Sequence, residues 1–273
     1  MNFSCLISCY HKESPVYLRE ALQSISNQTL QASEIVFVED GKLTQELYDV
    51  LDEFKNKLPF KFIKIDVNRG LGYALSQGLQ ACSNEIVMRM DADDVCVSYR
   101  FEMEHKFMVD NPDIDIVGAW SKVIDQGGKI IGERKYPTDH ASCYKLIWTN
   151  PIIHPSVAFK KDSIISIGSY NEHLIRKQDY DLWFRAADKG LKFANIPEFL
   201  LYYRITSSYH KKNDLKIAFQ QAIVGIKGVY RLKLPLYVYF AVFYPVIKSL
   251  LPSGLIKNSG KINSIIDPRS KYK

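Results

Sequence analysis

Short apolar runs alternate with amphipathic segments over roughly the first 110 residues of the chain. The runs typical of strands are Phe3–Cys9, Glu34–Val38, Phe60–Asp66 and Glu85–Met90. The segments with helical spacing are Pro15–Asn27, capped by Ser14, and then Thr44–Lys57, Leu71–Cys82 and Tyr99–Val109. This alternation predicts an α/β fold with a mostly parallel central sheet and helices on both faces.

Polar turns follow three of the predicted strands. They are Tyr10–Lys12, Glu39–Gly41 and Asp91–Asp94. Parallel strands end at a common edge of the sheet, where α/β folds bind their ligands. The last turn has three carboxylates in four positions, and because like charges repel, a hard cation such as Mg²⁺ or Mn²⁺ is the usual reason to assemble them. The alternative is a solvated loop that caps the next helix.

The three turns have complementary chemistry. Tyr10 can stack on a base, Asp40 can accept hydrogen bonds from a base or ribose, and the acidic turn can hold a cation that bridges two phosphates. Together they predict a pocket for a nucleoside diphosphate. Taken singly, Tyr10 is more often a core residue and Asp40-Gly41 a plain turn.

The second half supplies a candidate base and a candidate histidine. The segment Lys177–Phe184 opens a helix with Asp179 near its N-terminus, where a carboxylate is favoured by the helix dipole. Asp179 can act as a general base if an acceptor hydroxyl is held close to it, and helix capping is the alternative. His154 lies in the two-proline turn Asn150–Ser156, and taken alone it is more often structural than catalytic.

Composition places the chain among ordinary globular proteins. Its 273 residues, 47% hydrophobic and 24% charged, suit one large α/β domain with an appendage and exclude disorder or a fibre. The five cysteines form no Cys-x-x-Cys pair, so we expect buried thiols without disulfides or zinc, with Cys5 and Cys9 in the core. The first residues resemble neither a signal peptide nor a membrane span, and we expect a cytoplasmic protein.

Positive charge is concentrated at the C-terminal end. Residues 204–273 carry 13 Lys or Arg against two Asp, a balance of +11, while the whole chain carries +6, so the remainder carries −5. This end includes Leu234–Ile247, fourteen uncharged residues of which five are aromatic, and the segment is shorter than the about 20 residues of a membrane span. We expect a membrane-surface element, with a buried helical hairpin as the alternative. No nucleic-acid motif accompanies the charge.

A series of motifs in a fixed order resembles family 2 glycosyltransferases of the GT-A fold. The motifs are Ser8-Cys9-Tyr10, Val38-Glu39-Asp40-Gly41, Asn68-Arg69-Gly70-Leu71-Gly72, Met90-Asp91-Ala92-Asp93-Asp94, Asn150-Pro151-Ile152-Ile153-His154-Pro155 and Gln178-Asp179-Tyr180-Asp181-Leu182-Trp183. The resemblance covers about residues 1–210 and is strongest to bacterial enzymes of O-antigen, capsule and exopolysaccharide synthesis. It implies a GT-A domain over residues 1–208 and a C-terminal helical, membrane-associating extension over residues 209–273.

The resemblance also implies a reaction. It is inverting transfer from a nucleotide sugar, such as UDP-galactose or UDP-glucose, to a polyprenyl-diphosphate-linked saccharide at the inner face of the cell membrane. Asp179 is then the base, and Asp93 and His210 hold Mn²⁺ or Mg²⁺. His154 and Trp120 lie in the acceptor and sugar region. The implied donor-nucleotide residues are Ser8, Tyr10, Asp40, Arg69, Asp91 and Arg204, with Tyr10 and Asp40 at the uracil, Asp91 at the ribose and Arg204 over the diphosphate.

Two departures from the family pattern leave the donor preference open. Glu39 stands where an Asp is frequent, and Gln178 replaces a frequent Glu just before the candidate base. Two other enzyme classes remain as alternatives. An NAD-dependent oxidoreductase could use Gly70-Leu71-Gly72, although Leu75 stands where the dinucleotide fingerprint needs its third glycine. A sugar nucleotidyltransferase has a related architecture, but the N-terminus lacks a glycine-rich loop with Lys or Arg.

Overall fold

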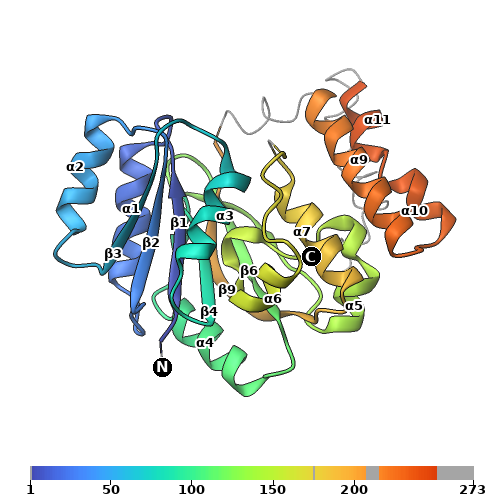
Figure 1. Cartoon of the computed structure of the whole chain (residues 1–273), viewed down its shortest axis with the longest axis horizontal. Helices are drawn as coiled ribbons and strands as arrows, with labels where there is room; N and C mark the ends of the chain where they lie inside the picture. Colours follow the sequence, from blue (N-terminus) through green and yellow to red (C-terminus); the bar gives the residue numbers. More distant parts are fainter. Residues whose placement is uncertain (1, 175, 207–214, 251–273) are drawn as a thin grey trace.

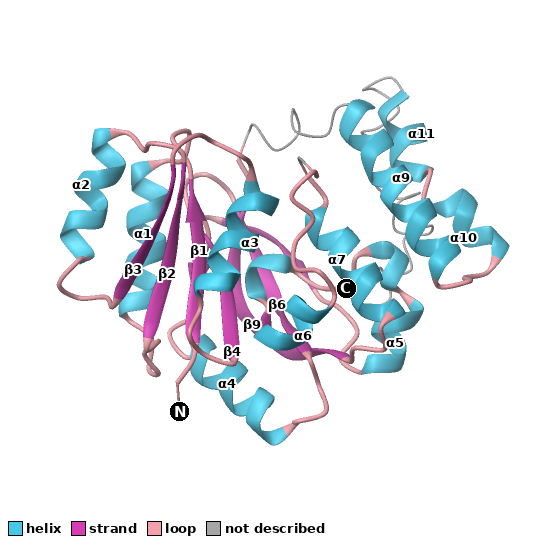
Figure 2. Cartoon of the chain, in the orientation of Figure 1, coloured by secondary structure: helices cyan, strands magenta, loops and turns pink. Residues whose placement is uncertain are grey.

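The computed structural model describes residues 2–174, 176–206 and 215–250, and within them the strands form one nine-stranded sheet (Figure 2). The sheet order is β3-β2-β1-β4-β8-β6-β9-β5, and β7 pairs with β6. The strands are β1 (Ser4–Cys9), β2 (Glu34–Asp40), β3 (Phe60–Ile65), β4 (Ile86–Asp91), β5 (Val95–Cys96), β6 (Ile116–Ile124), β7 (Ile130–Arg134), β8 (Ala158–Lys160) and β9 (Phe193–Arg204).

Strand direction divides the sheet into two parts. Strands β3, β2, β1 and β4 are all parallel, as the strand and helix alternation predicts. Beyond β4, strand β8 runs antiparallel to β4 and β6, whereas β6 and β9 are again parallel. The carboxyl ends of β1, β2 and β4 therefore meet at one edge of the sheet.

Helices cover both faces, which confirms the expected α/β architecture (Figure 1). One hydrophobic cluster joins the sheet to α1 (Pro15–Ser26), α2 (Gln45–Phe54) and α4 (Arg100–Asp110). A second joins the other face to α3 (Leu71–Ala81), α5 (His140–Lys145), α6 (Lys161–Ser166), α7 (Gln178–Asp188) and the C-terminal helices. Two 3-10 turns, Ile147–Thr149 and His154–Ser156, lie between α5 and β8.

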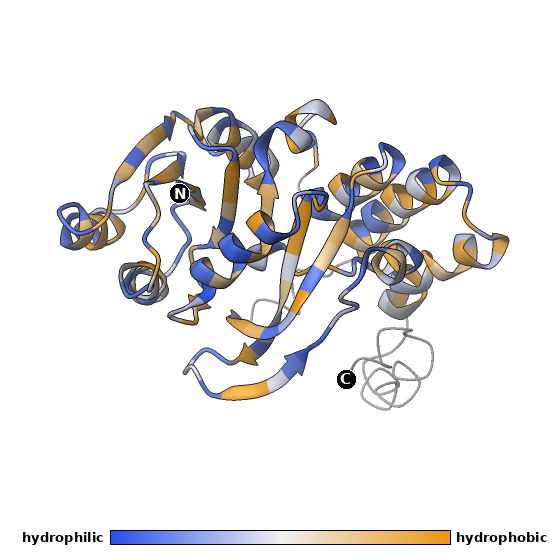
Figure 3. Ribbon diagram, turned by 90° about the horizontal axis from the view of Figure 1, so that it is seen from below, coloured by the Kyte–Doolittle hydropathy of each residue, from blue (hydrophilic) through white to orange (hydrophobic). Residues whose placement is uncertain are grey.

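The strand pattern explains why β1 is apolar along its whole length. Cys5 and Ile7 belong to the first cluster and Leu6 to the second, because successive side chains point to opposite faces and both faces are covered. Figure 3 shows hydrophobic residues along the central strands. All five cysteines are buried and free, as expected from the sequence. Each helix predicted in the first 110 residues is present, with its ends moved by up to three residues.

The C-terminal helices α9 (Leu215–Arg231), α10 (Leu236–Ala241) and α11 (Tyr244–Leu250) pack beyond α7 (Figure 1). A Cβ added at Gly228 would lie 2.2 Å from the Phe184 ring, so this glycine is what lets α9 lie directly on α7. The inner side of this helical group is buried, whereas Leu236 and Phe240 are more than 70% exposed. No helix in the described part of the chain is long and apolar enough to cross a membrane.

Candidate active site at the edge of the parallel strands

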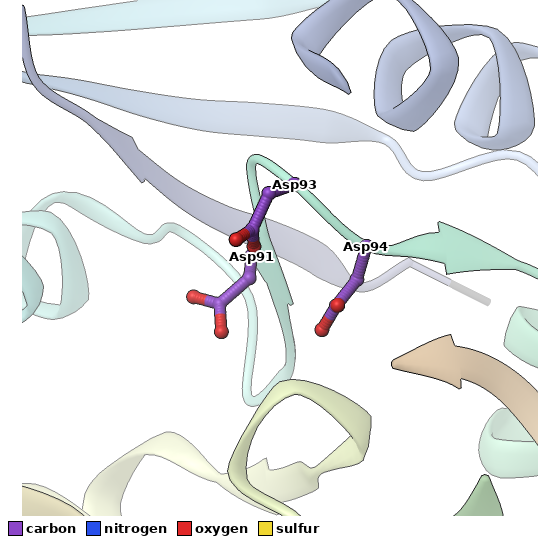
Figure 4. Close-up of side chains that lie close together, drawn as sticks. All are labelled: Asp91, Asp93 and Asp94. Atoms are coloured by element: carbon purple, nitrogen blue, oxygen red, sulfur yellow. The ribbon is translucent and has the colours of Figure 1, made fainter. Parts of the chain in front are cut away.

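The acidic turn after β4 brings three carboxylates together, as the sequence predicts. Ligand atoms of Asp91, Asp93 and Asp94 all lie within 4.8 Å of one another, and Figure 4 shows the three side chains around the turn. Across the sheet, Ser8 of β1 pairs with Asp91, so the strand-one turn lies beside the acidic turn. The oxygen-rich donor set has the chemistry that Mg²⁺ or Mn²⁺ requires.

Asp94 is the most confined member of this cluster. It is 1% exposed, and its Oδ1 accepts a hydrogen bond of 2.8 Å from the Arg204 backbone amide. Its Oδ2 is buried and makes no hydrogen bond within the described residues. Burial, followed by the charges of Asp93 and Asp91, raises the pKa of Asp94 well above its ordinary value. A buried, unsatisfied carboxylate oxygen in an acidic cluster fits a bound cation.

Arg89 is a buried cation behind the acidic turn that the sequence reading did not identify. Its guanidinium is 1% exposed and forms an ion pair with Asp91. Its Nε and Nη1 atoms make no hydrogen bond within the described residues. The signal in the sequence was an arginine inside the apolar run of β4, where an unpaired charge would be costly to bury.

Arg204 has a different position from the one expected over the diphosphate. Its side chain is 1% exposed and lies behind the acidic turn, where Nε donates to the Asp93 carbonyl oxygen at 2.7 Å. A second nitrogen forms an ion pair with Glu20 of α1, and the guanidinium lies 4.3 Å from the centre of the Tyr17 ring. These contacts occupy the guanidinium, so in this structure Arg204 holds the acidic turn against α1.

Asp40 also differs from the expectation of a free nucleotide ligand. It is 4% exposed, and its carboxylate accepts hydrogen bonds of 2.7–2.9 Å from the Asn68 side chain and the Arg69 and Gly70 amides. Its side chain therefore shapes the Asn68–Gly70 loop at the edge of the sheet. Next to it, Glu39 is equally buried and accepts a hydrogen bond from the Tyr48 hydroxyl.

The other two candidates on the nucleotide side are more accessible. Tyr10 is partly exposed after β1, and its ring packs edge-on against His11 at 5.7 Å between ring centres. Arg69 is exposed and stacks its guanidinium 4.3 Å from the centre of the Tyr73 ring. Both side chains are accessible to a ligand at this edge of the sheet.

Asp179 lies in the first turn of α7 and is partly exposed. Its Oδ2 accepts a hydrogen bond of 2.8 Å from the Nδ2 of Asn150, which has a left-handed backbone with φ of 58°. The Asn150–Ser156 turn therefore orients the candidate base. Sequence reading singled out this turn for its histidine, although the residue that contacts Asp179 is the asparagine.

The segment around the Asn150–Ser156 turn connects Asp179 with the strand that ends in the acidic turn. Asn150 binds Asp179 at one end of this segment, and at the other end the Val157 carbonyl accepts a hydrogen bond of 2.8 Å from the Arg89 amide of β4. The end of β4 and the start of α7, separated by almost 90 residues of sequence, are thus held by one segment. Behind it Tyr170 is buried, and burial raises the pKa of its phenol.

His154 and Trp120, which the sequence suggested for the acceptor and sugar region, both make hydrogen bonds within the protein. His154 is 7% exposed, its Nε2 lies 2.9 Å from the Tyr170 hydroxyl, and burial together with Arg89 lowers its pKa well below 6.5. It is a neutral core residue. Trp120 is partly buried on β6 and donates from Nε1 to the Tyr136 carbonyl at 3.0 Å, while its ring packs on Phe199. His210 lies outside the described residues.

Comparison with known proteins decides the family. The family model described as "Glycosyl transferase family 2" matches residues 4–183. The chain belongs to this family. AmsE, an amylovoran biosynthesis glycosyltransferase of Erwinia amylovora, is 38% identical to this family 2 chain over 86% of both proteins. A UDP-Gal:alpha-D-GlcNAc-diphosphoundecaprenol beta-1,3-galactosyltransferase of Escherichia coli is 36% identical, over 84% of this chain and 82% of that protein.

Solved structures show the same fold at low sequence identity. TarS 1-349 of S. aureus in complex with UDP-GlcNAc has a TM-score of 0.69 and 16% identity, covering 91% of this chain and 72% of that one. The mannosyltransferase PcManGT of Pyrobaculum calidifontis, in complex with GDP-Man and Mn²⁺, has a TM-score of 0.61 and 16% identity, and the match covers 99% of this chain and 82% of that one. These likenesses confirm the GT-A type of α/β fold expected for the family 2 chain.

The glycines that suggested a dinucleotide site have structural roles in this family 2 chain. Gly70 has φ of +91°, and its amide donates to Asp40. A Cβ at Gly72 would lie 2.6 Å from the Asn171 carbonyl oxygen, so only glycine allows this close approach. Neither the geometry nor the comparisons support an oxidoreductase or a nucleotidyltransferase.

Proposed function

We propose that the protein is an inverting, metal-dependent glycosyltransferase that uses a UDP-sugar and a polyprenyl-diphosphate-linked saccharide in surface polysaccharide synthesis. The observation that carries this proposal is the acidic turn at the end of β4 together with Asp179, which Asn150 orients from the segment that also binds β4. The names of the E. coli and E. amylovora relatives support the acceptor and the process, and the UDP-GlcNAc complex of TarS supports a UDP-sugar donor.

Donor binding takes place at the edge formed by β1, β2 and β4. Tyr10 and Arg69 are accessible there, and Ser8 and Asp91 lie in register on neighbouring strands. Asp40 contributes by holding the Asn68–Gly70 loop through the hydrogen bonds that its carboxylate accepts.

Asp93, together with Asp91 and Asp94, would hold Mn²⁺ or Mg²⁺. When bound, such a cation supplies positive charge for the departing diphosphate. Arg89 limits the mutual repulsion of the carboxylates by pairing with Asp91. Arg204 holds the backbone of the turn through the Asp93 carbonyl, so the ligand oxygens keep their spacing.

Asp179 accepts the proton of the acceptor hydroxyl in this proposal. Asn150 binds Oδ2 and fixes the orientation of the carboxylate, which leaves Oδ1 to receive the proton. As that proton leaves, the hydroxyl oxygen attacks the anomeric carbon on the face opposite the diphosphate. A single displacement inverts the anomeric centre without a covalent nucleophile on the protein.

Replacing Asp179 by Asn tests the proposal. Asn keeps the shape of the side chain but cannot take a proton, so kcat should fall by roughly 10²–10⁴ while the Kd for the UDP-sugar stays nearly unchanged. The matched control is Asp181→Asn, because Asp181 lies in the same helical turn and pairs with Arg185. Near wild-type turnover of Asp179→Asn would refute the assignment, and loss of donor binding would make Asp179 a donor ligand.

The proposed membrane contact lies on the outer side of α10 and α11. Leu236, Tyr237 and Phe240 are 62–73% exposed there, and Arg231 and Lys233 are exposed nearby. Aromatic and cationic side chains together favour an anionic membrane interface. Phe240→Asp should weaken binding to vesicles that contain phosphatidylglycerol, with Ile130→Asp on β7, which is 51% exposed, as the control. Equal binding by both variants would argue against this surface.

A further inference from the structure

A groove separates α9 from the segment that leads into α7, and its volume is about 470 Å³. Small-molecule sites range over about 300–1,000 Å³. Its walls are formed by Leu174 on the α7 side and by Phe219 and Ile223 on α9, with Lys216 and Lys227 also on the lining. Phe219 and Ile223 are 46% and 53% exposed, so the groove presents apolar surface to solvent.

The residues of α9 give the groove a distinct chemical pattern. Phe219, Ile223 and Lys227 follow one another at four-residue spacing and therefore share one face of the helix. Lys216 lies one turn before Phe219, and the two lysines are about 16 Å apart along the helix axis. An apolar centre with an ammonium group toward each end is complementary to an anionic headgroup with a hydrocarbon chain.

The groove also adjoins the helix that carries the candidate base. Leu174 on its wall lies in the segment before α7, and Asp181 of α7 is on its lining, two residues after Asp179. The same helix contacts α9, because Tyr180 and Phe184 lie against the glycines Gly225 and Gly228. Among the described residues of the lining, the acidic side chain is Asp181, and its charge is offset by an ion pair with Arg185 at 2.8 Å.

We propose that this groove binds the lipid part of the acceptor: the first isoprene units along Phe219 and Ile223, and the diphosphate at Lys216 or Lys227. The inference rests on the proposed function for the identity of the acceptor. It adds the surface that holds the lipid while the attached saccharide reaches Asp179. The exposed apolar side of α10 and α11, the proposed membrane contact, belongs to the same helical group as the groove wall on α9.

The experiment measures calorimetric binding of farnesyl diphosphate to the full chain, with pyrophosphate and farnesol as comparators. Ile223→Asp should weaken farnesyl diphosphate binding by about tenfold or more, because it removes apolar contact and adds a negative charge. The double variant K216A/K227A should lose affinity for farnesyl diphosphate and not for farnesol. Ile130→Asp on β7, at an apolar position that is 51% exposed and lies outside the groove, is the matched control and should change the Kd less than twofold.

Two results would overturn the groove assignment. They are equal losses of farnesyl diphosphate affinity in Ile223→Asp and Ile130→Asp, and a concentration-dependent dimer that Ile223→Asp dissociates. The second would identify a second copy of the protein as the occupant of the groove. UDP binding with Mn²⁺ is measured on the same preparations. If the wild type does not bind UDP with Mn²⁺, the result counts against the proposed function. If UDP binding is retained and the groove variants bind farnesyl diphosphate as the wild type does, the result counts against the groove alone.

Discussion

Arg204 provides the sharpest test of how the acidic turn is held. If its guanidinium acts by binding Glu20 and the Asp93 carbonyl, its removal should loosen the turn and weaken metal binding. If it instead contacts the donor diphosphate, as the family resemblance implied, its removal should weaken UDP binding with or without a metal. The variants Arg204→Ala, Arg204→Lys and Glu20→Gln separate these two roles.

The structure sets the expected magnitudes. Hydrogen bonds to charged groups contribute about 1.5–3 kcal/mol each, and a cation–π contact such as the one with Tyr17 about 0.5–2 kcal/mol. Glu20 is about half exposed, so the contribution of its bond with Arg204 lies at the low end of the first range. We expect Arg204→Ala to lower the free energy of unfolding by about 3 kcal/mol, which leaves a domain of typical stability folded. Loss of such support around a metal site costs about 10–100-fold in metal affinity.

The conservative substitutions Arg204→Lys and Glu20→Gln discriminate between the two roles. Lysine keeps the positive charge but lacks the planar fork that reaches both Glu20 and the Asp93 carbonyl, so Arg204→Lys should weaken Mn²⁺ binding nearly as much as alanine does. Glu20→Gln should weaken it by a smaller factor. Arg19→Ala is the matched control, because it removes an exposed ion pair with Glu53 from the same helix.

The assay is calorimetric titration of Mn²⁺ in the presence of UDP, together with UDP binding in EDTA and denaturant unfolding of each variant. A positioning role predicts that the variants lose Mn²⁺ affinity in the presence of UDP, whereas their UDP affinity in EDTA changes little. The reasoning is refuted if Arg204→Lys and Glu20→Gln keep wild-type Mn²⁺ affinity while Arg204→Ala loses UDP binding in EDTA as well.

Three further outcomes follow from the same geometry. Asp93→Ala should abolish Mn²⁺-dependent UDP binding without lowering apo stability, because it removes one carboxylate from a repelling cluster; undiminished affinity by calorimetry would contradict this. The pKa of His154 is lower in the folded than in the unfolded protein, so its contribution to the free energy of unfolding should be present above a pH of about 6.5 and lost as the pH falls below it. His154→Gln should remove this part of the pH dependence of stability. An unchanged pH dependence would assign it to another group. Gly228→Ala should destabilise the protein by about 1–3 kcal/mol because its Cβ would strike Phe184, whereas Gly132→Ala, with a nearest neighbour at 3.8 Å, should not; equal melting curves would show that α9 is not held in this way.

Local spacing in the sequence determined the elements and the place of the chemistry. The apolar runs and helical segments of the first 110 residues predicted strands and helices that the structure confirms, because periods of two and 3.6 residues are properties of the local backbone. The acidic turn and the helical position of Asp179 followed in the same way. The ordered motifs were sufficient to predict the family, since each occupies a fixed place along the chain.

Tertiary structure alone decided which of these side chains are accessible. Arg204 and Glu20 are 184 residues apart in sequence, and Asp40 meets the Arg69 amide across 29 residues. His154 becomes a neutral core residue because burial, together with the charge of Arg89, lowers its pKa, and its Nε2 is paired with the Tyr170 hydroxyl. Contacts of this range depend on how the helices and strands pack against one another, and the local pattern of the sequence carries no information about whether an arginine or a histidine faces a ligand or a buried partner.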